Sequence, residues 1–406
     1  MEIIEEKHTA ESRTKLLVEY KKFNPSNYNF ISEFLIGDNK YLCYESTQVI
    51  DNKWDDFVTS VNESCVQQLS GWVDVKQLEG WNFKRIIYVN ERSIIGGYQI
   101  LIKKLPFLLK IGYINHGPVL KKSDSKIVER IVTDFEKLCK KNKINIAIIN
   151  PPVEPKELVD ELKRRYSKNN IYNVTEAEAE LDISGDEQVF YKNFLRMRKQ
   201  NIHKSNKYEF KVVEGNENDL ENFFNLMNET CKRNNVKPNP PSIQSLKKIW
   251  EYYYPKNLLK LYNFYIGEEL VSSILAFEYQ DTFTPWKFGW SGKKSSYKPN
   301  DVFHWELIKI AKRKGFSKYN FGGINKSVAE KFLDHSKKLN PEEQKSSTFF
   351  KMGFGCYIKE FPESKIYITN SILRNFYRIY VLLIPYRNKL RKLFTFNLSS
   401  YLLIFK

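Results

Sequence analysis

The chain has 406 residues, more than one typical hydrophobic core accommodates, so two domains are expected. Hydrophobic residues make up 42% and aromatic residues 15% of the chain, which excludes a globally disordered protein. The formal net charge of +17 favours polyanionic partners such as RNA, nucleotide pyrophosphates or anionic lipid. A soluble protein from a lysine-rich proteome has the same balance, so charge alone does not choose the partner.

The five cysteines are scattered, and none forms a Cys-x-x-Cys pair. This pattern argues for a reducing compartment and against a zinc site, with buried free thiols as the plainest interpretation. The segment Met1 to Lys7 is acidic and polar, so no classical signal peptide is expected. These features favour a cytoplasmic protein without a metal.

The first half of the chain alternates strand and helix signals. An N-terminal extension is expected to end within 41–50, and a helix with acids in its first turn to begin at Trp54. The remaining predicted elements are strands at 85–90, 94–103 and 111–119 (broken by Gly117 and Pro118), a helix at 125–140 and a buried strand at 145–150.

The second half repeats this style. Asp186 is expected to cap a helix that buries Phe190, Phe194 and Met197 on one face. A helix over 218–233 is expected to turn inward Leu220, Phe223, Phe224 and Met227. The other predicted elements are a loop at 237–241, strands at 260–266, 270–279, 282–291 and 319–323, and a helix at 302–314 that ends at Gly315.

These elements predict an α/β (α+β) fold with two mixed-sheet modules flanked by helices. The expected divisions are an N-terminal extension (1–50), a first module (51–185), a second module (186–365) and a basic amphipathic C-terminal segment (366–406). The last segment is rich in Ile, Leu, Phe and Tyr, contains no acid, and its Pro385 and basic residues argue against a membrane span. Such a segment either lies on an anionic membrane or packs back on the body.

Several motifs follow one another in a particular order along the chain. They are WDDFV (54–58), QLSGWVDVKQLEGW (68–81), GYINHGPVL (112–120), ELDISGDEQVFYKNFLRMRKQNIHKS (180–205), YKPNDVFHWELIKIAKRKGFSKYNFGG (297–323) and FFKMGFG (349–355). Together they resemble the Fem-type (FemABX) family over roughly 54–355. Two departures are His116, where an arginine is common before Gly-Pro, and Asn320, where an aspartate is common before Phe-Gly-Gly.

The resemblance implies two modules of the GNAT acetyltransferase fold and no cofactor. Members of the family move an aminoacyl group from aminoacyl-tRNA to an amine of a peptidoglycan precursor. The expected partners are therefore aminoacyl-tRNA, a lipid- or nucleotide-linked wall precursor and an anionic surface at the inner face of the membrane. Two alternatives stay open: an acyl-CoA- or carrier-dependent N-acyltransferase in surface polysaccharide synthesis, and a non-catalytic RNA- or membrane-binding protein.

No Ser/His/Asp arrangement and no glycine-rich pyrophosphate loop before a helix is visible in the sequence. The first absence disfavours nucleophilic catalysis, and the second favours a tRNA donor over acyl-CoA. A transferase of this kind needs positive charge where the oxyanion develops. No general base stands out, and Asp301 is interpreted as a helix cap.

The resemblance assigns roles to individual positions. It places Phe350 and Lys351 at the active site, with Lys351 as first choice for transition-state stabilisation. The predicted substrate contacts, with an acceptor phosphate at the two basic positions, are Lys76, Arg233, Trp72 and His116. Independently of the resemblance, the density of basic residues between the modules predicts possible RNA contacts at Arg196, Arg198, Lys199 and Lys204. An ordinary solvated charge is the alternative for each basic residue.

Overall fold

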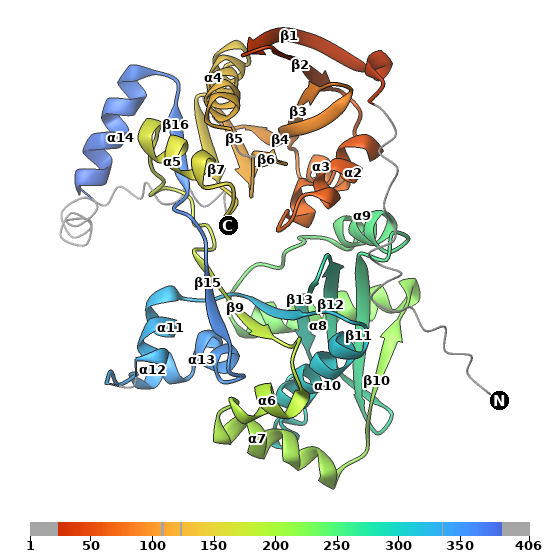
Figure 1. The fold of residues 1–406 in the computed structure, drawn as a ribbon. Coiled ribbons are helices and arrows are strands. Elements are labelled where there is room, and N and C mark those ends of the chain that lie inside the picture. The colour runs from red at the N-terminus through yellow and green to blue at the C-terminus, as the bar shows by residue number, and fades with distance from the viewer. Residues whose placement is uncertain (1–22, 107–108, 122–123, 335, 384–406) are drawn as a thin grey trace. The chain divides into compact units, whose positions relative to one another are not determined.

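A computed structural model describes all residues except 1–22, 107–108, 122–123, 335 and 384–406. The described chain forms two compact units (Figure 1). Of the described residues, the N-terminal unit comprises those within 23–174 and 361–383, and the C-terminal unit comprises those within Thr175–Glu360. Over these residues the chain passes from the N-terminal unit to the C-terminal unit and back again.

The N-terminal unit is a nine-stranded sheet in the order β1-β2-β3-β4-β5-β7-β16-β8, with β6 beside β4. Neighbouring strands are antiparallel except for the parallel pair β5 and β7. The strands are β1 (Tyr28–Ile36), β2 (Asn39–Ser46), β3 (Asn82–Asn90), β4 (Ser93–Lys104), β5 (Lys110–Asn115), β6 (Val119–Leu120), β7 (Ile146–Asn150), β8 (Ser167–Lys168) and β16 (Lys365–Ile368). The helices are α2 (Asn52–Ser60), α3 (Gly71–Leu78), α4 (Ser125–Lys141), α5 (Lys156–Arg165) and α14 (Ser371–Leu383).

The C-terminal unit is a seven-stranded sheet in the order β10-β11-β12-β13-β14-β9-β15, with β13 and β14 parallel. Its strands are β9 (Ala177–Asp182), β10 (Phe210–Gly215), β11 (Leu259–Ile266), β12 (Glu269–Tyr279), β13 (Thr282–Trp290), β14 (Lys318–Gly323) and β15 (Tyr357–Glu360). Its helices are α6 (Glu187–Lys192), α7 (Arg196–His203), α8 (Leu220–Arg233), α9 (Ile243–Tyr253), α10 (Pro299–Arg313), α11 (Lys326–Leu333), α12 (Pro341–Gln344) and α13 (Ser347–Met352).

Both sheets follow the same plan. In each sheet a run of successive antiparallel strands, β1 to β5 or β10 to β13, leads to one parallel pair, β5 with β7 or β13 with β14. A helix (α4 or α10) occurs in the connection between the two parallel strands. An antiparallel strand then continues the sheet, β16 in the N-terminal unit and β9 in the C-terminal unit. This arrangement confirms the predicted fold class of two mixed sheets flanked by helices.

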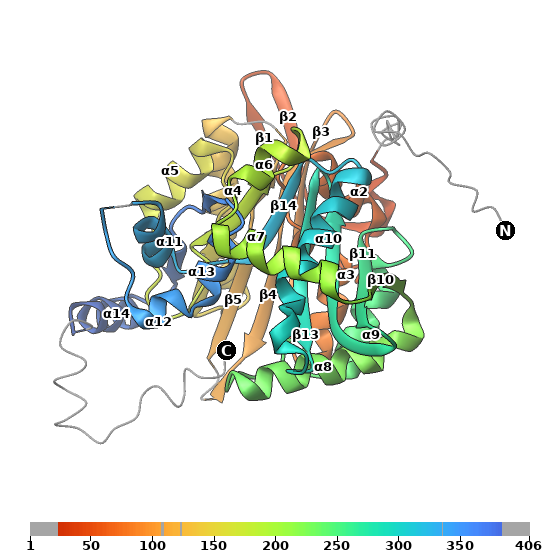
Figure 2. The same ribbon diagram turned by 90° about the horizontal axis from the view of Figure 1, so that it is seen from below.

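Glycines let a helix approach each sheet closely. A Cβ atom at Gly97 in β4 would lie 2.7 Å from the Trp54 ring of α2. A Cβ atom at Gly289 in β13 would lie 2.7 Å from the Met227 backbone nitrogen of α8. The opposite faces carry the main cores, which include α4 and α10 respectively (Figures 1 and 2). Each sheet is therefore covered by helices on both faces.

The ends of the modules differ from the expected divisions. Residues 28–46 are not an extension, because β1 and β2 form a hairpin whose second strand pairs with β3 and buries Tyr41 and Cys43. After the C-terminal unit, the chain returns to the N-terminal unit at Phe361, and β16 pairs between β7 and β8. The expected tail therefore begins as a strand and a helix of that unit, while its residues 384–406 lie outside the described residues.

Three predictions about helices are wrong in detail. The helix capped by Asp186 ends at Lys192, and α7 then begins at Arg196, which leaves Met197 43% exposed. In α8 the inward position is taken by Leu226, while Phe224 is only partly buried. Asp301 lies in the first turn of α10 rather than at its cap, because the helix begins at Pro299, and its carboxylate accepts a hydrogen bond from Arg198.

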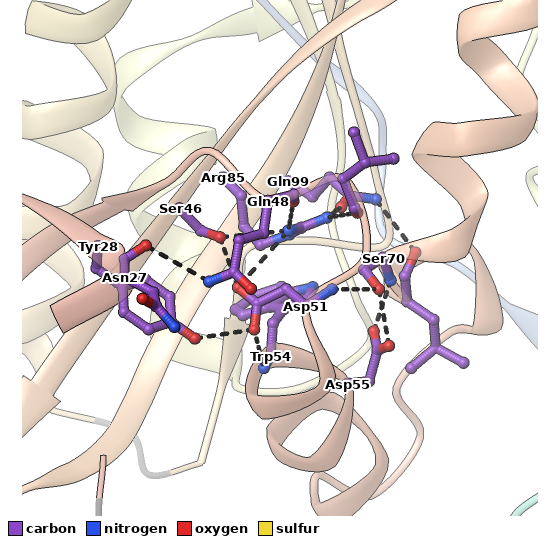
Figure 3. Close-up of polar contacts among 12 residues, drawn as sticks. Asn27, Tyr28, Ser46, Gln48, Asp51, Trp54, Asp55, Ser70, Arg85 and Gln99 are labelled. Atoms are coloured by element: carbon purple, nitrogen blue, oxygen red, sulfur yellow. Dashed lines mark hydrogen bonds and ion pairs between the residues drawn. The ribbon is translucent and has the colours of Figure 1, made fainter. Parts of the chain in front are cut away.

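A buried polar network holds the start of α2 in the N-terminal unit (Figure 3). Arg85 in β3 is 0% exposed, and its Nη1 lies 3.6 Å from an Asp51 carboxylate oxygen. Its guanidinium also donates to the Gln99 side chain at 2.6 Å and to the Gln48 carbonyl at 2.7 Å. Asp51 in turn accepts from the Trp54 backbone N–H at 3.0 Å, which caps α2. One arginine thus links β3 and β4 to the start of α2.

Replacing Arg85 by Gln is expected to lower the free energy of unfolding by about 3 kcal/mol, because Asp51 would remain buried without its cation. Urea unfolding measures the change. The control is Arg164→Gln, which removes an ion pair to Glu161 from a side chain that is 64% exposed and should cost less than about 1 kcal/mol. Equal losses for the two variants would contradict a stabilising role of the network.

Candidate functional site

A row of polar side chains crosses the C-terminal unit on three neighbouring strands. In β9, Ala179 and Leu181 face the core, so Glu178 and Glu180 project from the other face. Glu180 lies opposite Asn320 of β14 and Tyr357 of β15, and Glu178 lies opposite Lys359. Residues directly opposite on one face interact. The strand register therefore brings two carboxylates, an amide, a phenol and an ammonium group together.

The Asn320 side chain forms hydrogen bonds with both acids. Its Nδ2 donates to Glu178 at 2.7 Å and to Glu180 at 3.4 Å, while its Oδ1 accepts from the Gly322 N–H at 2.7 Å. The Tyr357 hydroxyl donates to Glu180. These donors compensate the carboxylate of Glu180, which is 1% exposed, and that of Glu178, which is partly buried. An asparagine at this position supplies a donor that an aspartate would lack.

Lys351 approaches this row from α13. Its Nζ donates to the Gly323 carbonyl at 2.7 Å, at the end of β14. Burial lowers the pKa of Lys351 to about 8, and the Glu178 carboxylate partly opposes that change. Burial likewise raises the pKa of Glu178, an effect that the Asn320 hydrogen bond reduces. Lys351 is thus a cation whose charge is sensitive to pH near neutrality.

Aromatic rings surround the base of this site. His304 Nδ1 and the Tyr319 hydroxyl share a hydrogen bond of 2.8 Å. The centre of the His304 ring lies 5.6 Å from the centre of the Phe350 ring. Burial, together with the positive charges of Lys351 and Arg198, lowers the pKa of His304 to about 3. The imidazole is therefore neutral at physiological pH, which suits a packing role better than proton exchange near neutrality.

Arg198 fixes the position of α13. Its Nη1 lies 2.7 Å from Asp301 Oδ1, and its guanidinium lies 4.3 Å from the centre of the Phe350 ring. A Cβ atom at Gly353 would lie 2.9 Å from Arg198 Nε, and Gly355 adopts φ +73. Both glycines of the FFKMGFG motif are thus explained by close approach or left-handed backbone.

The four residues predicted to contact RNA differ in their exposure to solvent. Arg196 and Lys204 are exposed, and Lys199 is partly buried with its Nζ donating to the Lys192 carbonyl at 2.7 Å. Arg198 is 6% exposed and paired with Asp301. The prediction that Arg198 contacts RNA is therefore corrected to a structural role, because its side chain points into the unit.

Lys76 and Trp72 lie together on α3 of the N-terminal unit. Lys76 Nζ is 5.3 Å from the centre of the Trp72 ring and forms hydrogen bonds of 2.9 and 2.8 Å with both Glu79 oxygens. The Lys76 side chain is 15% exposed, and Trp72 is 8% exposed. Glu79 already neutralises this lysine, so a phosphate at Lys76 would have to compete with that carboxylate.

His116 and Arg233 belong to different units. His116 has φ +47 and lies with its ring 4.9 Å from that of Phe361, at the end of β5. Arg233, at the end of α8, donates to the Trp290 carbonyl and stacks 5.2 Å from that indole ring. Its side chain remains 37% exposed. Both positions stay predictions as substrate contacts.

Sequence reasoning missed Glu178, Glu180, Tyr357 and Lys359. The segment 177–182 (AEAELD) carried a usable signal, because acids alternate with small or apolar residues as on a strand with one polar face. Nothing in the sequence indicated that β15, which begins at Tyr357, pairs beside β9.

Within the ranges that the structure describes, no helix has both the length and the hydropathy needed to cross a bilayer. In the same residues, no three His, Cys, Asp or Glu side chains are grouped so that they could hold a metal ion.

Comparisons with known proteins match a different family model to each of the two compact units. A model of the FemAB family matches residues 49–176, and a model of the acetyltransferase (GNAT) domain matches residues 190–331. The crystal structure of FemX resembles this chain with a TM-score of 0.68 and 17% sequence identity, over 85% of this chain and 99% of that chain. This likeness shows a shared fold.

Curated relatives include the Lipid II:glycine glycyltransferases of Staphylococcus haemolyticus and Staphylococcus epidermidis. The first is 29% identical over 203 residues and the second is 28% identical over 203 residues. Each match covers 47% of this chain and 48% of the relative. The chain therefore spans about half the length of the curated relatives that it matches.

The polar row yields a prediction about Asn320. Asn320→Asp should lower the free energy of unfolding by about 1–3 kcal/mol at neutral pH, because two carboxylates lose a donor and gain a like charge. The loss should shrink as the pH falls and the carboxyl groups take up protons. Asn206→Asp, at an exposed position, adds the same charge and serves as the control in denaturant unfolding at several pH values. A loss that does not change with pH would contradict the electrostatic explanation.

Proposed function

The chain belongs to the Fem-type family and contains GNAT-like modules, and on this premise we propose that it is an aminoacyltransferase acting on a cell-wall precursor. The donor in this proposal is aminoacyl-tRNA, and the acceptor is an amine of a lipid-linked wall peptide. The names of the glycyltransferase relatives support the acceptor class. The net charge of +17 is compatible with a polyanionic donor.

The observation that carries the proposal is the position of Lys351. It is a partly buried ammonium group at the end of β14, and the Glu178 carboxylate favours its charged form. A cation in such a water-poor setting stabilises developing negative charge more strongly than one in bulk water. No covalent enzyme intermediate is required, because the aminoacyl ester is already activated.

The proposed reaction is a direct aminolysis. The neutral acceptor amine attacks the ester carbonyl, the C–N bond forms, and the C–O bond to the tRNA ribose oxygen breaks. The proton lost by the amine ends on the released hydroxyl, so the step needs no oxidant or other co-reactant. Lys351 stabilises the charge that develops on oxygen, and Glu178 is a positioning residue that keeps Lys351 protonated.

The direct test combines the full-length chain, tRNA charged with labelled glycine, and lipid II. Transfer of label to the precursor that disappears after RNase treatment of the charged tRNA is the expected result. Transfer from an acyl-CoA without RNA would instead support the acyl-CoA-dependent alternative, which the GNAT domain match also favours. Absence of transfer from either donor would contradict the proposal.

Lys351 also sets an expected pH dependence. Its pKa of about 8 means that the ammonium form is lost as the pH rises through that value, so turnover should fall on the alkaline side. Lys351→Arg should keep the charge and remove this alkaline decline. Glu178→Gln should move the decline to lower pH, because the carboxylate raises the pKa of Lys351.

Lys351→Ala should reduce turnover by about 10²–10³-fold with little change in melting temperature. Lys345→Ala is the matched control, since that lysine is exposed and close in sequence. A Lys351→Ala enzyme with the wild-type rate would remove Lys351 from the catalytic site.

A further inference from the structure

Helix α14 is firmly attached to the N-terminal unit by one of its faces. Tyr377 is 8% exposed, and its hydroxyl donates to the Lys168 carbonyl at 2.5 Å and accepts from the Asn170 N–H at 3.0 Å. Arg374 donates to the Ile368 carbonyl at 3.1 Å. Partly buried side chains of the same face pack on β7 and β16, namely Leu373, Tyr380 and Val381. The helix is therefore an ordered part of the unit.

The other face of α14 exposes large apolar side chains, which we call the α14 stripe. Its members and their exposed fractions are Ile372 (63%), Phe376 (64%), Ile379 (54%), Leu382 (71%) and Leu383 (46%). Steps of four, three and four residues from Ile372 to Leu383 keep successive members on one side of the helix. Such a grouping differs from singly scattered surface residues and is typical of an interaction surface.

The charges beside the stripe have one sign. The only charged residues in α14 are Arg374 and Arg378, and the sequence contains no acid from Ser364 to Lys406. The chain that follows the helix adds Arg387, Lys389, Arg391 and Lys392. The positive charge of α14 itself opposes contact with the same face of a second copy and favours a negatively charged partner.

The length of the helix limits how it can meet that partner. The 13 described residues of the helix extend about 20 Å, whereas a bilayer core is about 30 Å thick. The helix is also held along its length by the buried face that contains Tyr377. It can therefore lie parallel to a surface without leaving the N-terminal unit.

We propose that the α14 stripe docks on an anionic lipid bilayer. The apolar side chains enter the boundary between headgroups and acyl chains, and the exposed Arg378 contacts lipid phosphates. This combination of an exposed apolar stripe and one-sided positive charge matches a lipid surface better than an acidic peptide, which would leave the stripe in water. The inference does not depend on the transfer chemistry.

The test uses the full-length chain and vesicle flotation. Vesicles of phosphatidylcholine mixed with phosphatidylglycerol should carry the wild-type protein, and vesicles of phosphatidylcholine alone should carry much less. Phe376→Glu/Ile379→Glu should weaken binding by at least about tenfold, because two apolar contacts become repelled carboxylates. The matched control is Leu35→Glu/Val189→Glu, which changes side chains 70% and 60% exposed outside α14 and should bind as the wild type does.

A second variant protects the test against misfolding. Arg378→Glu changes an exposed charge without touching the stripe, and it should weaken binding to the anionic vesicles only. Melting temperatures of all variants verify the fold. The proposal would be overturned if the wild-type protein bound neither kind of vesicle. It would also be overturned if Phe376→Glu/Ile379→Glu bound as tightly as Leu35→Glu/Val189→Glu. A dimer in solution that the double variant dissociates while vesicle binding is unaffected would likewise overturn it, since a second copy would then cover the stripe.

Discussion

The C-terminal unit depends on how β9 is paired between β14 and β15. This register sets Glu178 and Glu180 on one face of the sheet, where two neighbouring carboxylates out of water would be strongly unfavourable without compensation. Asn320 supplies the shared donor, and Lys351 supplies a nearby positive charge. The same contacts leave Lys351 in a setting where burial favours the neutral amine and Glu178 favours the ammonium ion. The opposing effects produce a lysine that changes charge near physiological pH.

The two units use one architecture for different purposes. In the N-terminal unit, the strand that corresponds to β9 is β16, whose sequence KIYI contains no acid. The network of Arg85 and Asp51 places buried charge in that unit, where its contacts hold the start of α2 to the sheet. In the C-terminal unit, the buried pair of Arg198 and Asp301 supports Phe350 and the helix that carries Lys351. Polar interactions thus stabilise the first unit and position Lys351, the proposed catalytic residue, in the second.

Much of the fold was predictable from the sequence, because periodicity and glycine or proline breaks are local signals. The strands β3, β4, β11, β12 and β13 and the helices α4, α8 and α10 lie where the pattern predicted them. The position of β16 between β7 and β8, and that of β9 between β14 and β15, were not predictable in this way. Each depends on strands that are distant in the sequence. The site followed the same division. Lys351 and Phe350 were identified from a motif resemblance, whereas Glu178 became visible only when its strand was placed beside Gly323 and Lys359. Arg198 was misjudged because a basic stretch does not reveal which of its members turns inward.

The pKa of Lys351 in the full-length chain tests most directly whether this residue is the pH-sensitive cation of the proposed site. Nuclear magnetic resonance of protein labelled with ¹³C-lysine reports the titration, and Lys351→Arg identifies the resonance by its loss. The account predicts a midpoint of about 8. A midpoint at the ordinary lysine value of about 10.4 would show a fully solvated amine and contradict the proposed site.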